Sequence, residues 1–121
     1  MKKVEKIEPK KALEQAFALW KNIDKNGKEY YTGNDLNDHK LIAFNNINKK
    51  NENEPDIRVY ELNKENEIGD NVASLWSNTS KDGKTNFMSG VTSDDEKLVA
   101  FYNSDTSNNK PYLRCYFKDE N

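Results

Sequence analysis

Apolar residues along this chain come in short segments separated by polar stretches, which is the spacing of strands and turns. Residues 57–62 and 113–117 alternate apolar and polar side chains with a period of two, and this predicts strands with one buried face. Residues 41–44 and 98–101 are continuous apolar runs, and these predict central strands buried on both faces. The hydrophobic pattern therefore indicates β structure.

Two further segments, residues 18–23 and 74–79, each lead into a turn that contains glycine. The turns hold Asn-Gly at positions 26–27 and Asp-Gly at positions 82–83. Either dipeptide between apolar segments is the strongest short-range signal of a β-hairpin. We expect a type I′ turn at both places, because Asn, Asp and Gly tolerate the positive φ that its two central residues need.

The same motifs occur twice along the chain. The segment LWKNIDKNGKEYYTG at Leu19 returns as LWSNTSKDGKTNFMSG at Leu75, an offset of 56 residues. KLIAFNN at Lys40 returns as KLVAFYN at Lys97, and PDIRVYE returns as PYLRCYF. Such self-similarity is the signature of a duplicated structural unit. Positions that agree are then those that the scaffold needs, and positions that differ are free for function.

These patterns predict a mainly β fold of about eight antiparallel strands, in which two duplicated four-stranded units form a small sandwich or barrel. We expect one domain over residues 1–121, made of an N-terminal extension (1–17), a first repeat (18–62), a linker (63–71) and a second repeat (72–118). Pro9 and the helix-forming residues after it predict a short helix from Pro9 to about Gln15. The alternative is a strand that starts near Ala16.

Composition changes this picture in three ways. Hydrophobic residues make up 34% of the chain and charged residues 33%, so the core should be thin. The net charge of −2 weighs against a protein that binds phosphates without specificity. Cys115 is the only cysteine, which excludes an internal disulfide, and no apolar run resembles a signal peptide or a membrane span. We expect a cytoplasmic protein without a membrane partner.

The repeated motifs carry a resemblance. Their order is LW, N, G-K, a hydrophobic residue, G, a strand ending in AF-N, and P-(D/Y)-x-R-x-Y. This order resembles a family of small all-β bacterial proteins of unknown function, carried by plasmids, integrative elements and phages. The resemblance covers nearly the whole chain from Ala18 onward, and the N-terminal extension departs from it. It implies a mobile-genetic-element setting and an all-β fold, and it brings no catalytic residues.

The strongest candidate binding residues form a repeated pair, Arg58-x-Tyr60 and Arg114-x-Tyr116. Residues two apart share one face of a strand, so each repeat sets a guanidinium beside a phenol. If these faces are open, the two sets form a symmetric patch that stacks on bases or grips a protein. If they are closed, each arginine is buried by a carboxylate such as Asp56 or Glu61 and ties the sheets together, and this second arrangement is favoured.

Other conspicuous residues have simpler interpretations. Trp20 and Trp76 recur at one scaffold position, which favours a place in the core over ligand stacking. His39 is the only histidine, and a solvated loop position is expected. Cys115 matches Val59 in the repeat alignment, which indicates a buried hydrophobic position and not a nucleophile.

Two polar segments complete the set of candidates. Asn22-x-Asp24-x-Asn26-Gly27 looks like half of a calcium loop, but its twelfth position is Gly33 where a bidentate glutamate is required, so no metal is expected. The acidic run Asp94, Asp95 and Glu96 is a candidate interaction loop, with a solvated turn as the alternative.

An enzyme is the least favoured class, because the sequence has no recognisable nucleophile, metal-ligand or phosphate-loop motif. The leading hypothesis is a non-catalytic binding protein of a mobile element or phage that docks on a host or element protein, for example to inhibit a defence nuclease. The alternative is a single-stranded nucleic-acid-binding protein that uses the paired Arg-x-Tyr faces. Either is expected to act without a cofactor, as a monomer or homodimer.

Overall fold

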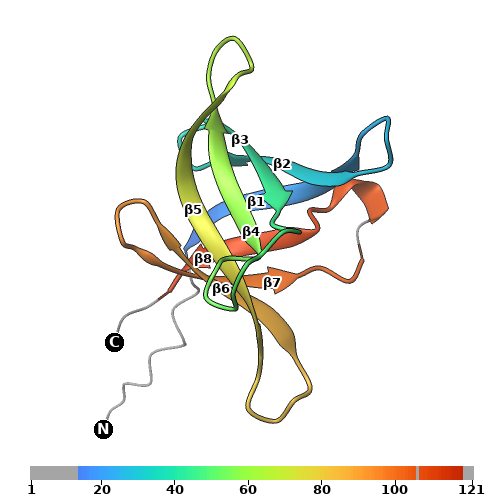
Figure 1. Ribbon diagram of the computed structural model, residues 1–121, viewed down its shortest axis with the longest axis vertical. Coiled ribbons are helices and arrows are strands. Elements are labelled where there is room, and N and C mark those ends of the chain that lie inside the picture. The colour runs from blue at the N-terminus through green and yellow to red at the C-terminus, as the bar shows by residue number, and fades with distance from the viewer. Residues whose placement is uncertain (1–13, 106, 119–121) are drawn as a thin grey trace, which may run out of the picture.

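The computed structural model describes residues 14–105 and 107–118, and these form eight antiparallel strands that close into a barrel (Figure 1). The strands are β1 (Gln15–Ile23), β2 (Glu29–Asp35), β3 (Lys40–Asn45), β4 (Ile57–Leu62), β5 (Ile68–Thr79), β6 (Asn86–Thr92), β7 (Lys97–Tyr102) and β8 (Leu113–Phe117). The predicted mainly β fold and its eight antiparallel strands are confirmed, and the barrel is the form that they take. Within the described residues, no helix has the length and apolar character needed to cross a membrane.

Each strand pairs with the next one along the chain, and β8 returns to pair with β1. The backbone N–H of Phe117 donates to the carbonyl of Glu14 at 2.9 Å, so the first and last described strands are hydrogen-bonded neighbours. This connectivity places the segments 24–28, 46–56, 80–85 and 103–112 at one end of the barrel, which we call the loop end. The turns at 36–39, 63–67 and 93–96 lie at the opposite end, which we call the turn end.

The barrel interior is filled by apolar side chains from all eight strands. Its most enclosed side chains are Leu19, Val59, Leu75, Met88, Leu98, Leu113 and Cys115. Among the described residues, no polar or charged side chain is buried. Interiors of eight-stranded barrels are just wide enough for side chains to fill them. A ligand of this protein therefore has to bind on the outer surface or at an end.

The burial of β3 and β7 corrects the sequence prediction for residues 41–44 and 98–101. Leu41 and Ala43 are buried, whereas Ile42 and Phe44 are partly exposed, and β7 shows the same alternation. These strands therefore have one buried face and not two. The wall of a closed barrel has an inner and an outer face, and the outer face of β3 and β7 is partly open to solvent.

The hairpin turns also differ from the prediction. Gly27 has φ 80° and Gly83 has φ 74°, but the residue before each glycine has no positive φ, so neither turn is type I′. Each is a longer loop with one left-handed residue at its end, the next most common hairpin connection. At the first of these turns, Asp24 Oδ1 accepts hydrogen bonds from the backbone N–H groups of Asn26 and Lys28.

Three turns at the turn end use the same device. Asp35, Asn63 and Thr92 each accept hydrogen bonds through a side-chain oxygen from the backbone N–H groups two and four residues later. Asp38, Asn66 and Asp95 supply the left-handed residue of these turns, with φ of 66°, 62° and 65°. Asn and Asp tolerate this conformation better than other residues with a side chain. These asparagine and aspartate residues therefore serve turn geometry.

Two predicted segments border the repeats, the helix from Pro9 to about Gln15 and the linker 63–71, and the structure describes part of the first and all of the second. The helix expected from Pro9 to about Gln15 falls largely outside the described residues, and its last residue is already in β1, which begins at Gln15. The alternative prediction, a strand starting near Ala16, matches this start. The predicted linker, residues 63–71, holds a turn followed by the first part of β5, which begins at Ile68. β5 is the longest strand, with 12 residues.

Candidate functional site

The two Arg-x-Tyr pairs lie on the outer surface of the barrel, because they alternate with the buried Val59 and Cys115. Arg58 is partly exposed and Arg114 is exposed. Strands β4 and β8 are separated by three strands in either direction around the closed barrel. The two sets therefore face opposite sides, and the single symmetric patch expected for open faces is not formed.

Each tyrosine of these pairs packs against a phenylalanine from the neighbouring strand. The ring centres of Phe44 and Tyr60 are 6.2 Å apart, and those of Phe101 and Tyr116 are also 6.2 Å apart. Phe101 is 42% exposed. Sequence reasoning missed both phenylalanines as surface residues, because the apolar runs that contain them were predicted to be buried on both faces. The outer surface thus carries two aromatic clusters, each next to an arginine.

The favoured prediction that carboxylates close these faces is wrong for Asp56. Its carboxylate accepts hydrogen bonds from Lys49 Nζ at 3.0 Å and from the backbone N–H of Ser77 at 2.7 Å. Among residues 14–105 and 107–118, no ion pair involves Arg58 or Arg114. In the described part of the chain, Asp56 therefore ties the 46–56 loop to β5.

Trp20 and Trp76 also differ from the prediction, since neither indole is in the core. Trp20 is 37% exposed, and Trp76 is partly exposed. The Trp20 indole N–H donates to the carbonyl of Asn109 at 2.7 Å, and that of Trp76 donates to the carbonyl of Asn53 at 2.9 Å. Each indole therefore holds the long loop of the other half of the chain against the barrel.

Three tyrosines gather at the loop end, and sequence reasoning did not single them out. The rings of Tyr31 and Tyr112 stack with centres 5.8 Å apart, and Tyr102 meets Tyr112 edge-on at 5.5 Å. Lys21 Nζ lies 4.2 Å from the centre of the Tyr112 ring, within cation–π range. The available signal was the repeat alignment, in which Tyr31, Tyr102 and Tyr112 correspond to Met88, Asn45 and Asp56, so that none of the matched positions in the other repeat carries an aromatic ring.

The phenols of this cluster act as hydrogen-bond donors. Burial raises the pKa of Tyr102, and the nearby Tyr112 and Asp56 add to this, against an opposing hydrogen bond with Ser77. Burial also raises the pKa of Tyr112, with a smaller contribution from Glu29. Both hydroxyl groups therefore stay protonated near neutral pH, and they can donate to a phosphate, a carbonyl or a base edge.

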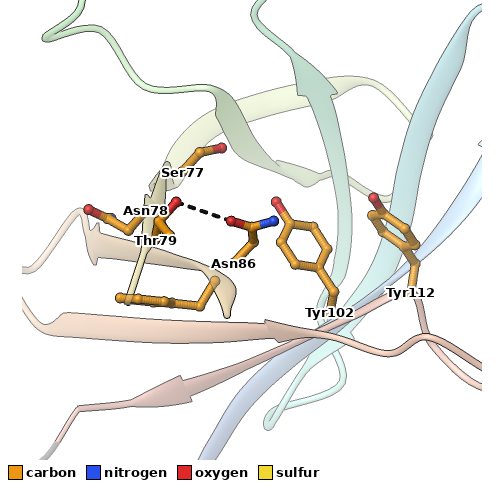
Figure 2. A pocket seen from close by; sticks show the side chains of 7 residues that line it. Ser77, Asn78, Thr79, Asn86, Tyr102 and Tyr112 are labelled. Atoms are coloured by element: carbon orange, nitrogen blue, oxygen red, sulfur yellow. Dashed lines mark hydrogen bonds between the residues drawn. The ribbon is translucent and has the colours of Figure 1, made fainter. Parts of the chain in front are cut away.

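An open cleft of about 620 Å³ lies beside these tyrosines at the loop end. Figure 2 shows Tyr102 and Tyr112 side by side, with their hydroxyl groups pointing the same way. Asn86 lies between Tyr102 and Thr79, and the Thr79 hydroxyl donates to Asn86 Oδ1 at 3.1 Å (Figure 2). The cleft wall thus combines aromatic faces with amide and hydroxyl groups.

Two more clefts meet at Tyr102. One, of about 570 Å³, includes Trp20, Lys21 and Lys110, and the other, of about 350 Å³, includes Phe101, Arg114 and Tyr116. Tyr102 contributes to all three clefts, which makes it their junction. We call this continuous surface the Tyr102 face, and it is defined by Lys21, Phe101, Tyr102, Lys110, Tyr112 and Arg114.

Comparisons of this chain with protein-family models, with curated proteins and with solved structures found no match. The resemblance to a mobile-element family therefore stays a prediction from the quoted motifs. The candidate site rests on its own geometry.

The remaining sequence candidates lie away from the Tyr102 face. His39 is exposed in a turn at the turn end, where its Nδ1 lies 3.0 Å from Asp35 Oδ2. Asp94, Asp95 and Glu96 form another turn at that end, and their side chains are exposed. No group of three or more histidine, cysteine, aspartate or glutamate side chains is arranged to hold a metal within the described segments. The backbone of these residues takes part in turns, and the interaction loop at Asp94, Asp95 and Glu96 stays a prediction.

Cys115 is fully buried, as the alignment with Val59 predicted. Burial raises the pKa of its thiol, so little thiolate forms in the folded protein. We expect no reaction with Ellman's reagent at pH 8 in native buffer, and one thiol per chain in 6 M guanidinium chloride. Cys115→Val, which introduces the matched residue, should keep the fold and abolish the signal in denaturant. Rapid labelling of the native protein would contradict the closed interior.

Proposed function

We propose that this chain is a non-catalytic binding protein and that the Tyr102 face binds a macromolecule. The observation that carries the proposal is the convergence of three open clefts on one partly exposed tyrosine, with aromatic and cationic side chains around it. The interior supports the same conclusion, because it is filled by apolar side chains and leaves the outer surface for ligands. Exposed aromatic residues gathered in one region are typical of interaction sites.

The proposal includes the duplication predicted from the sequence. Several contacts recur at the repeat offset: Phe17 pairs with Cys115 where Ala73 pairs with Val59, and the two indole hydrogen bonds correspond as well. On this basis, positions that differ between the halves are candidates for function. Lys21, Lys110 and Tyr112 of the Tyr102 face correspond to Ser77, Glu54 and Asp56 in the alignment. The matched positions of the other repeat thus have a similar backbone and a different charge.

We also propose the mobile-element setting and a host or element protein as the partner, which follow from the resemblance alone. A defence nuclease is one example of such a partner. The Arg58 side, with its Phe44–Tyr60 cluster, is the second surface that a protein partner would use.

Photo-crosslinking in living bacteria tests the binding function for a ligand of any chemistry. A photoreactive phenylalanine analogue is placed at Phe101, which is 42% exposed on the Tyr102 face. Irradiation should give discrete adducts of this variant, because a ligand on the face contacts that ring. Adducts are detected by gel shift, and digestion with nuclease or protease identifies their chemistry.

The matched control places the same analogue at Leu36, which is 59% exposed and lies at the turn end. This variant should give no discrete adduct. A Phe101 variant that forms no more adducts than the Leu36 variant would remove the Tyr102 face as a binding site.

A further inference from the structure

We infer that the ligand of the Tyr102 face is a single-stranded nucleic acid, an inference that rests on the binding function proposed above. The charge of this face, its aromatic rings and its contrast with the matched positions of the other repeat support this ligand. Sequence alone did not favour this ligand, because the net charge of the whole chain is −2. The net charge does not say where the charged side chains lie, and the structure shows their places on the surface.

Cations line the Tyr102 face and continue along the outer surface of β7 and β8. Lys21, Lys110 and Arg114 surround the junction of the clefts. Lys97 and Lys118 are exposed at the far end of the same strands, where the Lys118 N–H donates to the Lys97 carbonyl at 2.8 Å. Strand alternation places both on the side that carries Arg114. A phosphate backbone following β8 would meet these cations in succession.

The carboxylates near these lysines do not block phosphate binding. Lys21 lies 3.7 Å from Glu29, and Lys110 lies 3.4 Å from Asp105. Both pairs are solvent-exposed, and such pairs contribute on the order of 0–1 kcal/mol. A phosphate can therefore replace either carboxylate at small cost.

The aromatic rings favour single strands over duplexes. Phe101, Tyr102 and Tyr112 present partly exposed rings next to the cations, and Trp20 adds an indole that is 37% exposed. Unpaired bases can stack on such rings, whereas the bases of a duplex are stacked on one another and do not reach them. The protonated hydroxyl groups of Tyr102 and Tyr112 add donors for base or phosphate oxygens.

The matched positions of the other repeat lack this combination. In the repeat alignment, Glu54 takes the place of Lys110, Ser77 that of Lys21, and Asn45 that of Tyr102. The Asp56 carboxylate stands where Tyr112 presents its ring. Two of these matched positions, Glu54 and Asp56, are therefore carboxylates, which do not attract phosphates. We therefore expect one binding face on each molecule.

Fluorescence anisotropy with labelled 15-nucleotide dT and rU strands tests the inference on the full chain. We expect saturable binding at 50 mM salt and much weaker binding to a duplex of equal length. Two or three phosphate contacts imply that affinity falls by roughly 7- to 20-fold between 50 and 200 mM salt. Tyr102→Ala should weaken binding by about fivefold or more, as expected for the loss of one stacked base.

The repeat alignment supplies a matched pair of variants. The double variant Lys21→Ser and Lys110→Glu gives the Tyr102 face the residues of its counterpart, and we expect it to lose binding at 50 mM salt. The control Glu54→Lys changes charge at the matched position on the opposite side, and it should bind at least as well as the parent. Unchanged Cys115 protection from Ellman's reagent shows that both variants are folded.

The outcomes separate this inference from the proposed function. The absence of any anisotropy change at 50 mM salt, or equal binding by the double variant, would overturn the single-strand ligand. If the Phe101 photo-adducts are then destroyed by protease and resist nuclease, the face binds a protein and the proposed function stands. If no adduct forms either, both proposals fail.

Discussion

Gly33→Ala and Gly90→Ala are each expected to lower the free energy of unfolding by about 3 kcal/mol or more. A Cβ at Gly33 would overlap the carbonyl oxygen of Ala18, and one at Gly90 would overlap the carbonyl oxygen of Ser74. Backbone atoms of a paired strand cannot move aside as the end of a flexible side chain can. The two glycines thus permit a close approach of strands, a known role of glycine at tight bends of barrels.

Thermal and urea unfolding followed by circular dichroism measures this effect, and a loss of 3 kcal/mol corresponds to a fall in Tm of roughly 10 °C. Gly69→Ala in β5 is the matched control, because its Cβ would lie 3.1 Å from the Glu61 carbonyl oxygen, a tight contact without overlap. It should change the free energy of unfolding by less than about 1 kcal/mol. If Gly33→Ala and Gly90→Ala unfold like the control, the strands are not as close as described.

Leu19→Ala and Leu75→Ala are each expected to cost about 2–5 kcal/mol of stability. Both side chains are fully enclosed in the barrel, and both take part in strand pairs that close it, since Leu19 pairs with Leu113 and Leu75 with Ile57. Removal of such a side chain loses its burial and leaves a cavity that the surrounding strands only partly fill.

Urea unfolding with matched conditions measures both losses. Ile23→Ala is the control, because Ile23 lies on the same strand as Leu19 and is 64% exposed. It should change stability by less than about 0.5 kcal/mol. The two variants could instead lose amounts of stability that lie at opposite ends of the expected range. Such a result would show that the two side chains have unlike surroundings, which would count against the duplication.

The fold was largely accessible from sequence because strand periodicity and turn residues are local signals. The alternation in residues 57–62 and 113–117 reports one buried face directly. The type of the turns was not accessible in the same way. Asp24, Asp35 and Asn63 stabilise longer turns by side-chain hydrogen bonds, and the dipeptide Asn-Gly alone does not distinguish these from a type I′ turn.

The candidate site was less accessible, because it depends on which segments meet in space. Arg114 and Tyr116 were identified from sequence, whereas Tyr102 and Tyr112 were not, although one of them lies at the junction of three clefts. The two tryptophans were assigned to the core because large aromatic residues are usually buried. Their indole N–H groups instead reach loop carbonyls at the surface, a long-range contact that no local pattern shows.

The hydrogen-bonded pairing of β1 with β8 has a consequence for how the chain folds. Phe17 pairs with Cys115, so this seam of the barrel joins residues that are far apart in the sequence. The entropy lost in closing so large a loop is recovered only when the intervening strands are ordered. During synthesis, this edge of β1 therefore lacks its partner until β8 leaves the ribosome, and an unpaired strand edge favours aggregation.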